Sequence, residues 1–292
     1  MLALALLCSL SLAGAGLEAG REALDASVSW HAWRPGAPPP PTLFGVRAFD
    51  PETPEEGARA RALALQALGW LGVRPDAPPA GARLAYRVVP DEGFAGLWSA
   101  SLRQVGAALG AGGTLEAPAE IAGRVRAGRS LHLRLRAGEE RMELRLWAGR
   151  VRLRAGGEPV EARPEDVRFA RRRVRNFHPG VWIALALGPG GRLRHPGEEP
   201  GAPGLARLLA ALPDGEAMEY VIDVRDGRLV AERAWAKTRA GMGLVTGWLG
   251  PFREVGGVRV PWAWTSERQG RRVARGRVLA WTWLPGAGDE GD

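Results

Sequence analysis

A run of alternating residues between positions 217 and 283 constrains the fold of this 292-residue chain more than any other feature. Apolar residues recur there with period two, which is typical of strands that bury one face. Asp226-Gly227 interrupts the alternation, and an Asp-Gly pair accepts the positive φ values of a two-residue hairpin turn. Gly256-Gly257 and Gln269-Gly270 mark further turns. The run therefore predicts a series of antiparallel strands, at 218–224, 229–237, 258–264 and 273–283.

Two groups of apolar side chains on these strands predict an inward-facing wall. The first group is Val258, Val260, Trp262 and Trp264, and the second, on the next strand, is Leu279, Trp281 and Trp283. Period two places each group wholly inside or wholly outside. We expect both inside, because tryptophans and valines gathered on one strand face are too apolar to be left to water. Such a wall either packs against helices or lines a pocket.

A second alternating run, 119–154, predicts a four-stranded meander. Its leucines at 131, 133 and 135 alternate with His132, Arg134 and Arg136, so we expect the leucines to be buried and the polar residues exposed. Ala-Gly and Gly-Gly pairs separate the segments. Residues 83–89 predict one more strand. We expect 119–154 and 217–283 to join in a single antiparallel sheet.

Helices are predicted by caps and by apolar stripes. Thr53-Pro54-Glu55-Glu56 is a capping box, which predicts a helix that ends at Leu71 before Gly72. Residues 94–109 follow the i, i+3, i+4, i+7 rule, with Trp98 and Leu102 on the apolar stripe, and we expect this helix to pack into the concave side of the sheet. Further helices are predicted at 164–175, 181–187 and 205–212, with a loop at 188–204.

The N-terminus has the character of an export signal. Leu2 to Leu17 is small and apolar throughout and too short to span a membrane, and small residues from Ala13 to Gly16 suit a signal peptidase. Residues 1–20 are therefore predicted to be a signal peptide, although the missing Lys or Arg after Met1 leaves a retained anchor open. Residues 21–90 are expected to form a lead-in arm with one helix, and 286–292 a disordered tail.

The net charge of +8 comes almost entirely from arginines spread along the chain. Because they are interleaved with Glu and Gly, we interpret most of them as solvated strand faces and expect no nucleic-acid partner. The sharpest basic cluster is Arg171, Arg172, Arg173 and Arg175. It is either favourable charge at a helix C-terminus or a contact with anionic lipid headgroups.

Motifs that carry chemistry are missing from the sequence. The histidines at 31, 132, 178 and 195 have no metal-ligand spacing, and neither a Gly-x-Ser-x-Gly nor a phosphate-binding loop occurs. We therefore predict no catalytic residue, no metal site and no cofactor.

The order of elements, together with the segment Phe252-Arg253-Glu254-Val255-Gly256-Gly257-Val258-Arg259-Val260-Pro261 between two hairpins, resembles the LolA-type half-barrel of outer-membrane lipoprotein-sorting proteins. The resemblance spans 94–283 and implies a domain at about 91–285. It implies an α+β, mostly antiparallel fold, in which a curved, unclosed β-barrel wraps helices on its concave side. In that family the cavity holds acyl chains, which implies a ligand-binding set of Trp98, Leu102, Tyr220, Ile222, Val258, Val260, Trp262, Trp264 and Trp281.

Two functions remain open at this point. The first is a non-catalytic carrier or sensor of a lipid or lipoprotein acyl chain, exported to the periplasm or the outer face of the cytoplasmic membrane of a bacterium. The second is a structural or interaction protein of the envelope, with a closed core and an arginine-rich face that binds a partner.

Overall fold

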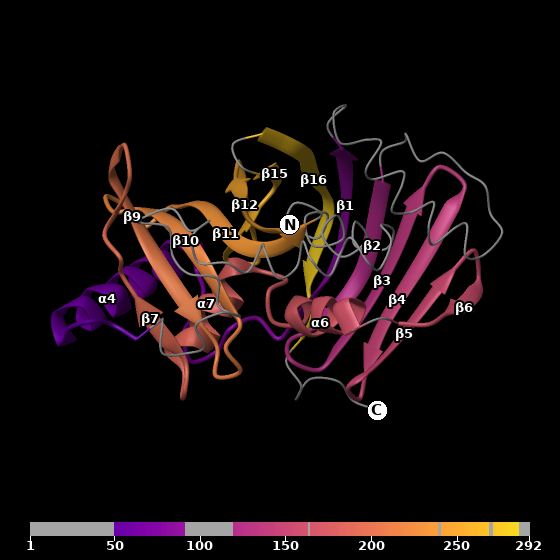
Figure 1. The fold of residues 1–292 in the computed structure, drawn as a ribbon, viewed down its shortest axis with the longest axis horizontal. Coiled ribbons are helices and arrows are strands. Elements are labelled where there is room, and N and C mark those ends of the chain that lie inside the picture. The colour runs from indigo at the N-terminus through magenta and orange to yellow at the C-terminus, as the bar shows by residue number, and fades with distance from the viewer. Residues whose placement is uncertain (1–49, 91–118, 163, 239–240, 269–270, 286–292) are drawn as a thin grey trace.

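The computed structural model describes residues 50–90, 119–162, 164–238, 241–268 and 271–285 (Figure 1). Its helices are α4 (Pro54–Leu71), α6 (Pro164–Arg173) and α7 (Pro179–Leu187). The predicted signal peptide, the helix at 94–109 with Trp98 and Leu102, and the tail at 286–292 lie outside these ranges. The remaining predictions are compared with the structure below.

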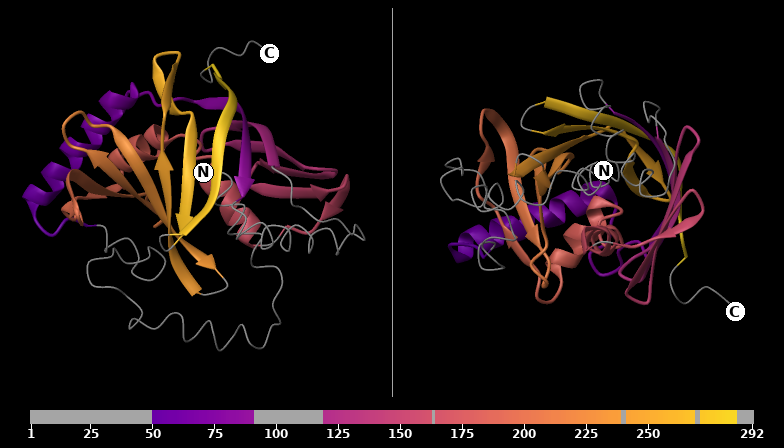
Figure 2. Two further views of the ribbon diagram at one scale, coloured as in Figure 1. Left: turned by 90° about the horizontal axis from the view of Figure 1, so that it is seen from above. Right: turned by 45° about the vertical axis from the view of Figure 1, so that its right-hand side comes forward.

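One 14-stranded antiparallel sheet forms the body of the molecule. The strand order is β6-β5-β4-β3-β2-β1-β16-β15-β12-β11-β10-β9-β7, with β8 paired to β9. The sheet does not close, and it bends around α6 and α7 (Figures 1 and 2). The predicted α+β half-barrel with helices on its concave side is confirmed. The strands are β1 (Gly81–Pro90), β2 (Ala119–Arg126), β3 (Ser130–Ala137), β4 (Glu140–Trp147), β5 (Arg150–Ala155), β6 (Glu158–Val160), β7 (Arg192–Arg194), β8 (Glu198–Glu199), β9 (Ala202–Ala211), β10 (Ala217–Asp223), β11 (Leu229–Thr238), β12 (Gly241–Leu249), β15 (Ala263–Arg268) and β16 (Arg271–Trp283).

The predicted meander is confirmed as β2 to β5. The three leucines of β3 are buried, Arg134 and Arg136 are exposed, and His132 is half-buried beside Glu143. The inner faces of these strands pack against β1, β16 and α6, which forms one core cluster of the molecule. A second cluster joins α4 and α7 to the inner faces of β9, β10 and β11.

The N-terminal helix follows its capping box. Thr53 Oγ1 accepts a hydrogen bond from Glu56 N at 3.1 Å, and Gly72 ends α4 with a φ of 73°. A Cβ atom at position 72 would lie 2.1 Å from the carbonyl oxygen of Gly257, so only glycine fits where α4 meets the hairpin beneath it. β1 then lies between β2 and β16, so residues of the predicted arm form the centre of the sheet.

The predicted helix at 205–212 is wrong, because these residues belong to β9 and the turn after it. β9 pairs with both β10 and β7, and residues 206–211 are buried on both faces. A strand that buries both faces loses its polar alternation, so its run of leucine and alanine has the composition of a helix. The predicted loop at 188–204 likewise contains β7 and β8.

The single strand predicted at 258–264 is also wrong. Residues Val258–Pro261 form β14, which pairs with β13 (Phe252–Val255) as a separate two-stranded sheet, and β15 begins only at Ala263. Pro261 has no N–H group with which to continue the ladder. At the break the backbone N–H of Trp262 donates to the carbonyl oxygen of Pro251 at 2.7 Å. The four predicted wall residues therefore do not share one strand face.

Leu279 is a third correction, since it points outward and is 43% exposed. Ala85 pairs with Ala280 and Tyr86 with Val278, which leaves Leu279 as an extra residue in β16. Because a β-bulge inserts one extra residue, even-numbered residues face inward before it and odd-numbered residues face inward after it. Val278 is therefore buried before the bulge, while Trp281 and Trp283 turn inward after it and pack against the core.

Candidate functional site

The structure divides the predicted ligand-binding residues between the two core clusters. Tyr220 and Ile222 are fully buried among α4, α7 and β9, with Val258 packed against the same cluster. Trp262, Trp264 and Trp281 belong to the other cluster. Val260 is fully buried. The seven of these residues that the structure describes are therefore not gathered in one cluster, and Trp264 and Trp281 line the same cavity.

This inner cavity has a volume of about 40 Å³. It lies inside the half-barrel near Leu249, which packs against both core clusters. Its walls come from β1, β12, β14, β15 and β16, and from the end of α6, the start of α7 and the segment between them. The lining residues are Leu84, Tyr86, Arg173, Phe177, Pro179, Leu249, Pro261, Trp264, Val278 and Trp281.

Four polar atoms in this lining have no hydrogen-bond partner within the described part of the chain. They are the Tyr86 hydroxyl, Arg173 Nε, Trp264 Nε1 and Trp281 Nε1. Each of these groups can donate a hydrogen bond, and Tyr86, Arg173 and Trp264 are buried. Burial lowers the pKa of Arg173, and another guanidinium nitrogen, Nη1, donates to the carbonyl oxygen of Asn176 at 2.8 Å. The cavity therefore presents donors, and one cation, to whatever enters it.

Aromatic rings fix the shape of the cavity. Trp264 meets Tyr86 edge to face, with ring centroids 5.5 Å apart. A Cβ atom on Gly276 would lie 2.1 Å from the Trp264 ring, so glycine at this position makes room for the indole. Trp281 and Trp283 contact each other at 5.2 Å, and the His178 ring lies 5.4 Å from Trp283. Trp264 is thus held in place before any ligand is present.

The sequence reasoning missed Tyr86, Arg173, Phe177 and Val278. Residues 82 to 88 alternate in burial along β1. The period-two pattern of the predicted strand at 83–89 was therefore a signal that could have placed Tyr86 on the inner face. Arg173 carried no such signal, because a buried arginine in a basic cluster has the same sequence pattern as exposed ones.

Beside this cavity, the inner face of the sheet carries a row of polar residues. Tyr220 pairs with Glu232, Glu232 with Gly247, and Gly247 with Ser266 along adjacent strands. Glu232 is 5% exposed, and burial raises its pKa to about 7, although the nearby Arg173 and Arg172 favour its ionised form. The tyrosine hydroxyl, the serine hydroxyl and Glu232 Oε2 have no partner among the described residues.

Replacing Glu232 with glutamine should stabilise the fold at alkaline pH. The pKa of Glu232 is raised on folding from 4.5 to about 7. Below pH 4.5 the carboxyl is neutral in both states, and as the pH rises through 7 the folded state loses stability because it holds a buried carboxylate. We expect Glu232→Gln to gain about 3 kcal/mol relative to the wild type between pH 4 and pH 8, since each pKa unit corresponds to about 1.4 kcal/mol. Urea unfolding at both pH values measures this difference. An equal effect of the substitution at the two pH values would contradict it.

The predicted basic cluster is mostly engaged within the protein. Arg173 is buried, and Arg175 pairs with Asp214 and with Glu216. The guanidinium of Arg172 lies 5.8 Å from the Trp182 ring centre. Of these four arginines, Arg171 alone is exposed. The predicted contact of this cluster with lipid headgroups stays a prediction. In this geometry Arg171 is the side chain that is free of burial and could make such a contact.

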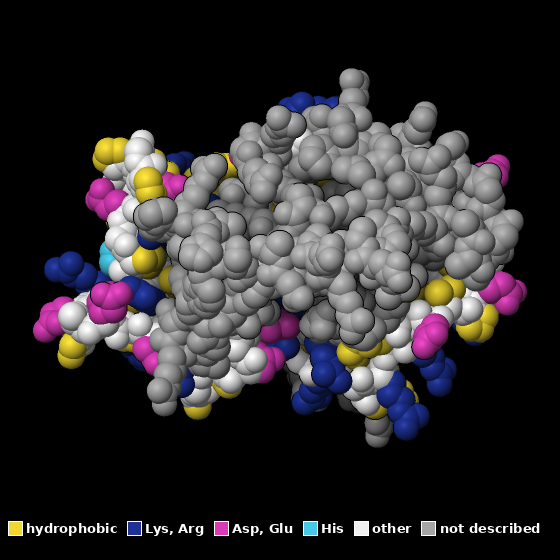
Figure 3. All heavy atoms as spheres, viewed as in Figure 1, with side chains coloured by type: hydrophobic (Ala, Val, Ile, Leu, Met, Phe, Trp, Pro, Cys, Tyr) yellow, Lys and Arg dark blue, Asp and Glu magenta, His cyan; other side chains and the backbone are white. Residues whose placement is uncertain are grey.

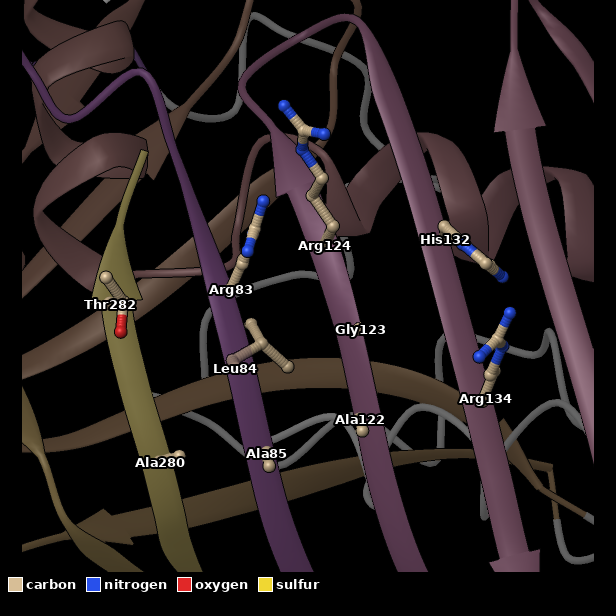
Figure 4. Close-up of a pocket in the computed structure, with 10 residues that line it drawn as sticks. All are labelled: Arg83, Leu84, Ala85, Ala122, Gly123, Arg124, His132, Arg134, Ala280 and Thr282. Atoms are coloured by element: carbon tan, nitrogen blue, oxygen red, sulfur yellow. The ribbon is translucent and has the colours of Figure 1, made fainter. Parts of the chain in front are cut away.

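A different basic surface lies on the outer face of the sheet. Figure 4 shows Arg83, Arg124 and Arg134 projecting from neighbouring strands on the side away from the helices. They surround a hollow of about 450 Å³ whose floor includes Ala85, Ala122 and Ala280. A space-filling view shows Lys and Arg side chains along the lower edge of the half that contains β3 to β6 (Figure 3).

Two kinds of feature are absent from the described ranges. No cluster of His, Cys, Asp and Glu in them has the arrangement of a metal site. None of the helices in the same ranges combines the length and the apolar character needed to cross a membrane.

Comparisons with known proteins find similarity in structure alone. No family model and no curated protein matches the sequence. A DUF1329 family protein from Desulfovibrio piger has a TM-score of 0.45 at 8% identity, over 80% of this chain and 95% of that one. A candidate outer membrane lipoprotein-sorting protein domain from Vibrio parahaemolyticus has a TM-score of 0.42 at 8% identity, over 80% and 95%. A LolA superfamily protein from Nitrosomonas europaea has a TM-score of 0.45 at 9% identity, over 78% and 95%.

The class of protein is therefore defined by its fold, an unclosed antiparallel half-barrel with helices inside. The likeness of the three solved structures to this chain concerns the fold alone.

Proposed function

We propose that the protein binds an acyl chain of a lipid or lipoprotein on the concave side of its half-barrel, as a non-catalytic carrier or sensor. The supporting observation is the inner cavity, which combines an aromatic wall with buried donors at its edge. An apolar wall stabilises a hydrocarbon chain by about 0.8 kcal/mol per buried methylene. The buried donors would meet an ester carbonyl or a carboxylate at the head of the chain. The predicted signal peptide supports a place outside the cytoplasm, in the periplasm or at the membrane that bounds it.

The cavity is too small to hold a chain as it stands. A volume of about 40 Å³ accommodates little more than one water molecule. Binding must therefore move side chains of the wall, and we expect Trp281 to move, because it lines the cavity and is half-buried. The apparent affinity is therefore the intrinsic affinity multiplied by the fraction of molecules in which the wall is open.

A pair of neighbouring substitutions tests the site. Val278 lines the inner cavity, whereas Leu279 is displaced by the bulge to the outer face. Val278→Phe should fill the cavity and abolish the binding of a long-chain fatty acid, and Leu279→Phe should leave it unchanged. Saturable quenching of tryptophan emission at micromolar ligand, on the order of −8 kcal/mol, measures binding, because Trp264 and Trp281 line the cavity. Far-UV circular dichroism checks that both variants keep their strands.

Trp262→Arg would be a poorer blocking variant. Trp262 does not line the inner cavity, and the guanidinium of Arg253 lies 4.6 Å from the centre of its ring. A positive charge at 262 would therefore face Arg253 and disturb the β14–β15 junction before it affected a ligand.

A closed envelope protein remains the second candidate, and the small volume of the cavity favours it. In that case the tryptophans serve only as core, and the arginine-rich outer face carries the function. The same titration separates the two, since a closed core gives no saturable quenching with the wild type or with either variant.

A further inference from the structure

The outer face of the half that contains β16 and β1 to β5 is strongly basic. Outward positions alternate along each strand, and arginine occupies most of them. This surface, called the outer arginine face below, is represented by Arg83, Arg87, Arg134, Arg145, Arg152 and Arg154.

Few carboxylates balance these charges. Among the described outward residues of the same strands they are Glu120 and Glu143. Glu120 pairs with Arg87 at 2.9 Å. Glu143 is shared by His132 at 2.6 Å, Arg145 at 2.8 Å and Arg134 at 3.5 Å, so one negative charge serves several partners. The face therefore keeps a large positive excess, which draws an anionic partner.

Small residues leave the centre of this face hollow. Ala280, Ala85 and Ala122 pair in register across β16, β1 and β2, which gives a row without long side chains. Adjacent hollows of about 450 and 500 Å³ follow this row and its continuation towards β5. Arg83 and Arg134 project beside the first hollow (Figure 4), so a phosphate-sized group can approach between arginines. Arg154 lines the second hollow together with Arg134.

Exposed apolar side chains lie on the same face. Trp147 is 76% exposed, and it has the outward parity of Glu143 and Arg145 on β4. It pairs directly with Arg150 across the β4–β5 hairpin. Leu279 is exposed on β16, within the lining of the second hollow. Tryptophan flanked by arginine is the combination found at membrane–water interfaces, where the indole enters the headgroup layer and the cation stays with the phosphates.

We propose that the outer arginine face binds the surface of an anionic phospholipid bilayer. The positive excess supplies the long-range attraction, and Trp147 with Leu279 supplies apolar contact that a soluble polyanion would not require. The face belongs to the side of the sheet opposite the inner cavity, so a membrane-bound molecule keeps its concave side turned away from the bilayer.

Vesicle flotation tests this assignment with a charge-matched pair of variants. One variant is Arg152→Gln with Arg154→Gln on β5, and the control is Arg59→Gln with Arg61→Gln on the exposed side of α4. The wild type and the control should float with vesicles of phosphatidylcholine and phosphatidylglycerol, and not with phosphatidylcholine alone. Each arginine near an anionic surface contributes about 1 kcal/mol, or roughly fivefold, so the β5 variant should bind about thirtyfold more weakly.

Trp147→Ala supplies an independent arm. It leaves every charge in place and should still weaken flotation severalfold if the indole enters the headgroup layer. Equal binding by the β5 variant and the α4 control, or equal flotation with neutral vesicles, would overturn the proposal. Binding to heparin or nucleic acid without flotation would also overturn it and would assign the face to a soluble polyanion.

Discussion

Trp182→Ala should destabilise the fold by about 3–5 kcal/mol, the range for deletion of a large buried aromatic side chain. Trp182 is 0% exposed and lies on α7, in the cluster that joins α4, α7 and the inner faces of β9 to β11. Its Nε1 donates to the carbonyl oxygen of Ala210 at 3.0 Å. The substitution leaves a cavity and removes this bond between the helix and the sheet. Urea unfolding at neutral pH gives the difference in free energy.

Two further variants show which part of this loss comes from packing. Trp182→Phe keeps most of the apolar volume but cannot donate to Ala210, so it should cost less than the alanine variant. Trp147→Ala removes the same side chain from an exposed position and should change stability by no more than about 0.5 kcal/mol. If Trp182→Ala costs as little as Trp147→Ala, α7 is not part of the core.

His178 should make the fold less stable as the pH falls from neutrality towards 4. Its ring is completely buried, with Nδ1 accepting from Gly180 N at 3.1 Å and Nε2 within 2.9 Å of the carbonyl oxygen of Arg259. Burial lowers its pKa from 6.5 to about 4, although the bond to Arg259 favours the charged form. Between these two values the unfolded chain binds a proton that the folded chain does not bind. The loss therefore begins below pH 6.5 and reaches about 3 kcal/mol below pH 4.

The effect has to be separated from that of Glu232, whose sign is opposite. Glu232 binds its proton more tightly in the folded state, so its contribution falls as the pH rises from 4.5 to 7. In a Glu232→Gln background, stability should decline from pH 7 to pH 4. Adding His178→Gln should lower stability at pH 7, because the imidazole that caps the N-terminus of α7 is lost. It should also flatten the decline of stability between pH 7 and pH 4. A decline of the same slope with and without His178 would assign it to other groups.

The strands of the meander could be predicted because one face of each is exposed to solvent. The leucines of β3 alternate with polar residues, and this pattern by itself gave the strand and its buried side. β9 could not be recognised, because it is buried on both faces and its pairing partners lie elsewhere in the sequence. Pro261 did signal a break in the strand, and its effect was overlooked.

The candidate site was less accessible from the sequence than the fold. The bulge at Leu279 depends on the register between β1 and β16, which no local pattern reveals. The meeting of Arg173 with Tyr86 and Trp264 around one cavity depends on how α6 lies inside the sheet. The predicted tryptophan wall brought Trp264 and Trp281 together correctly, whereas Val258 packs in the other cluster and Trp262 packs in the same cluster without lining the cavity.

Lipid extraction with mass spectrometry, on protein purified from its native host, tests the central claim most directly. If the half-barrel holds an acyl chain, the extract should contain one class of acyl lipid in an amount comparable to that of the protein. The lipid should be absent from Val278→Phe and retained by Leu279→Phe. An extract without lipid from the wild type, together with no saturable quenching by a fatty acid, would contradict the claim and leave a protein whose core is closed.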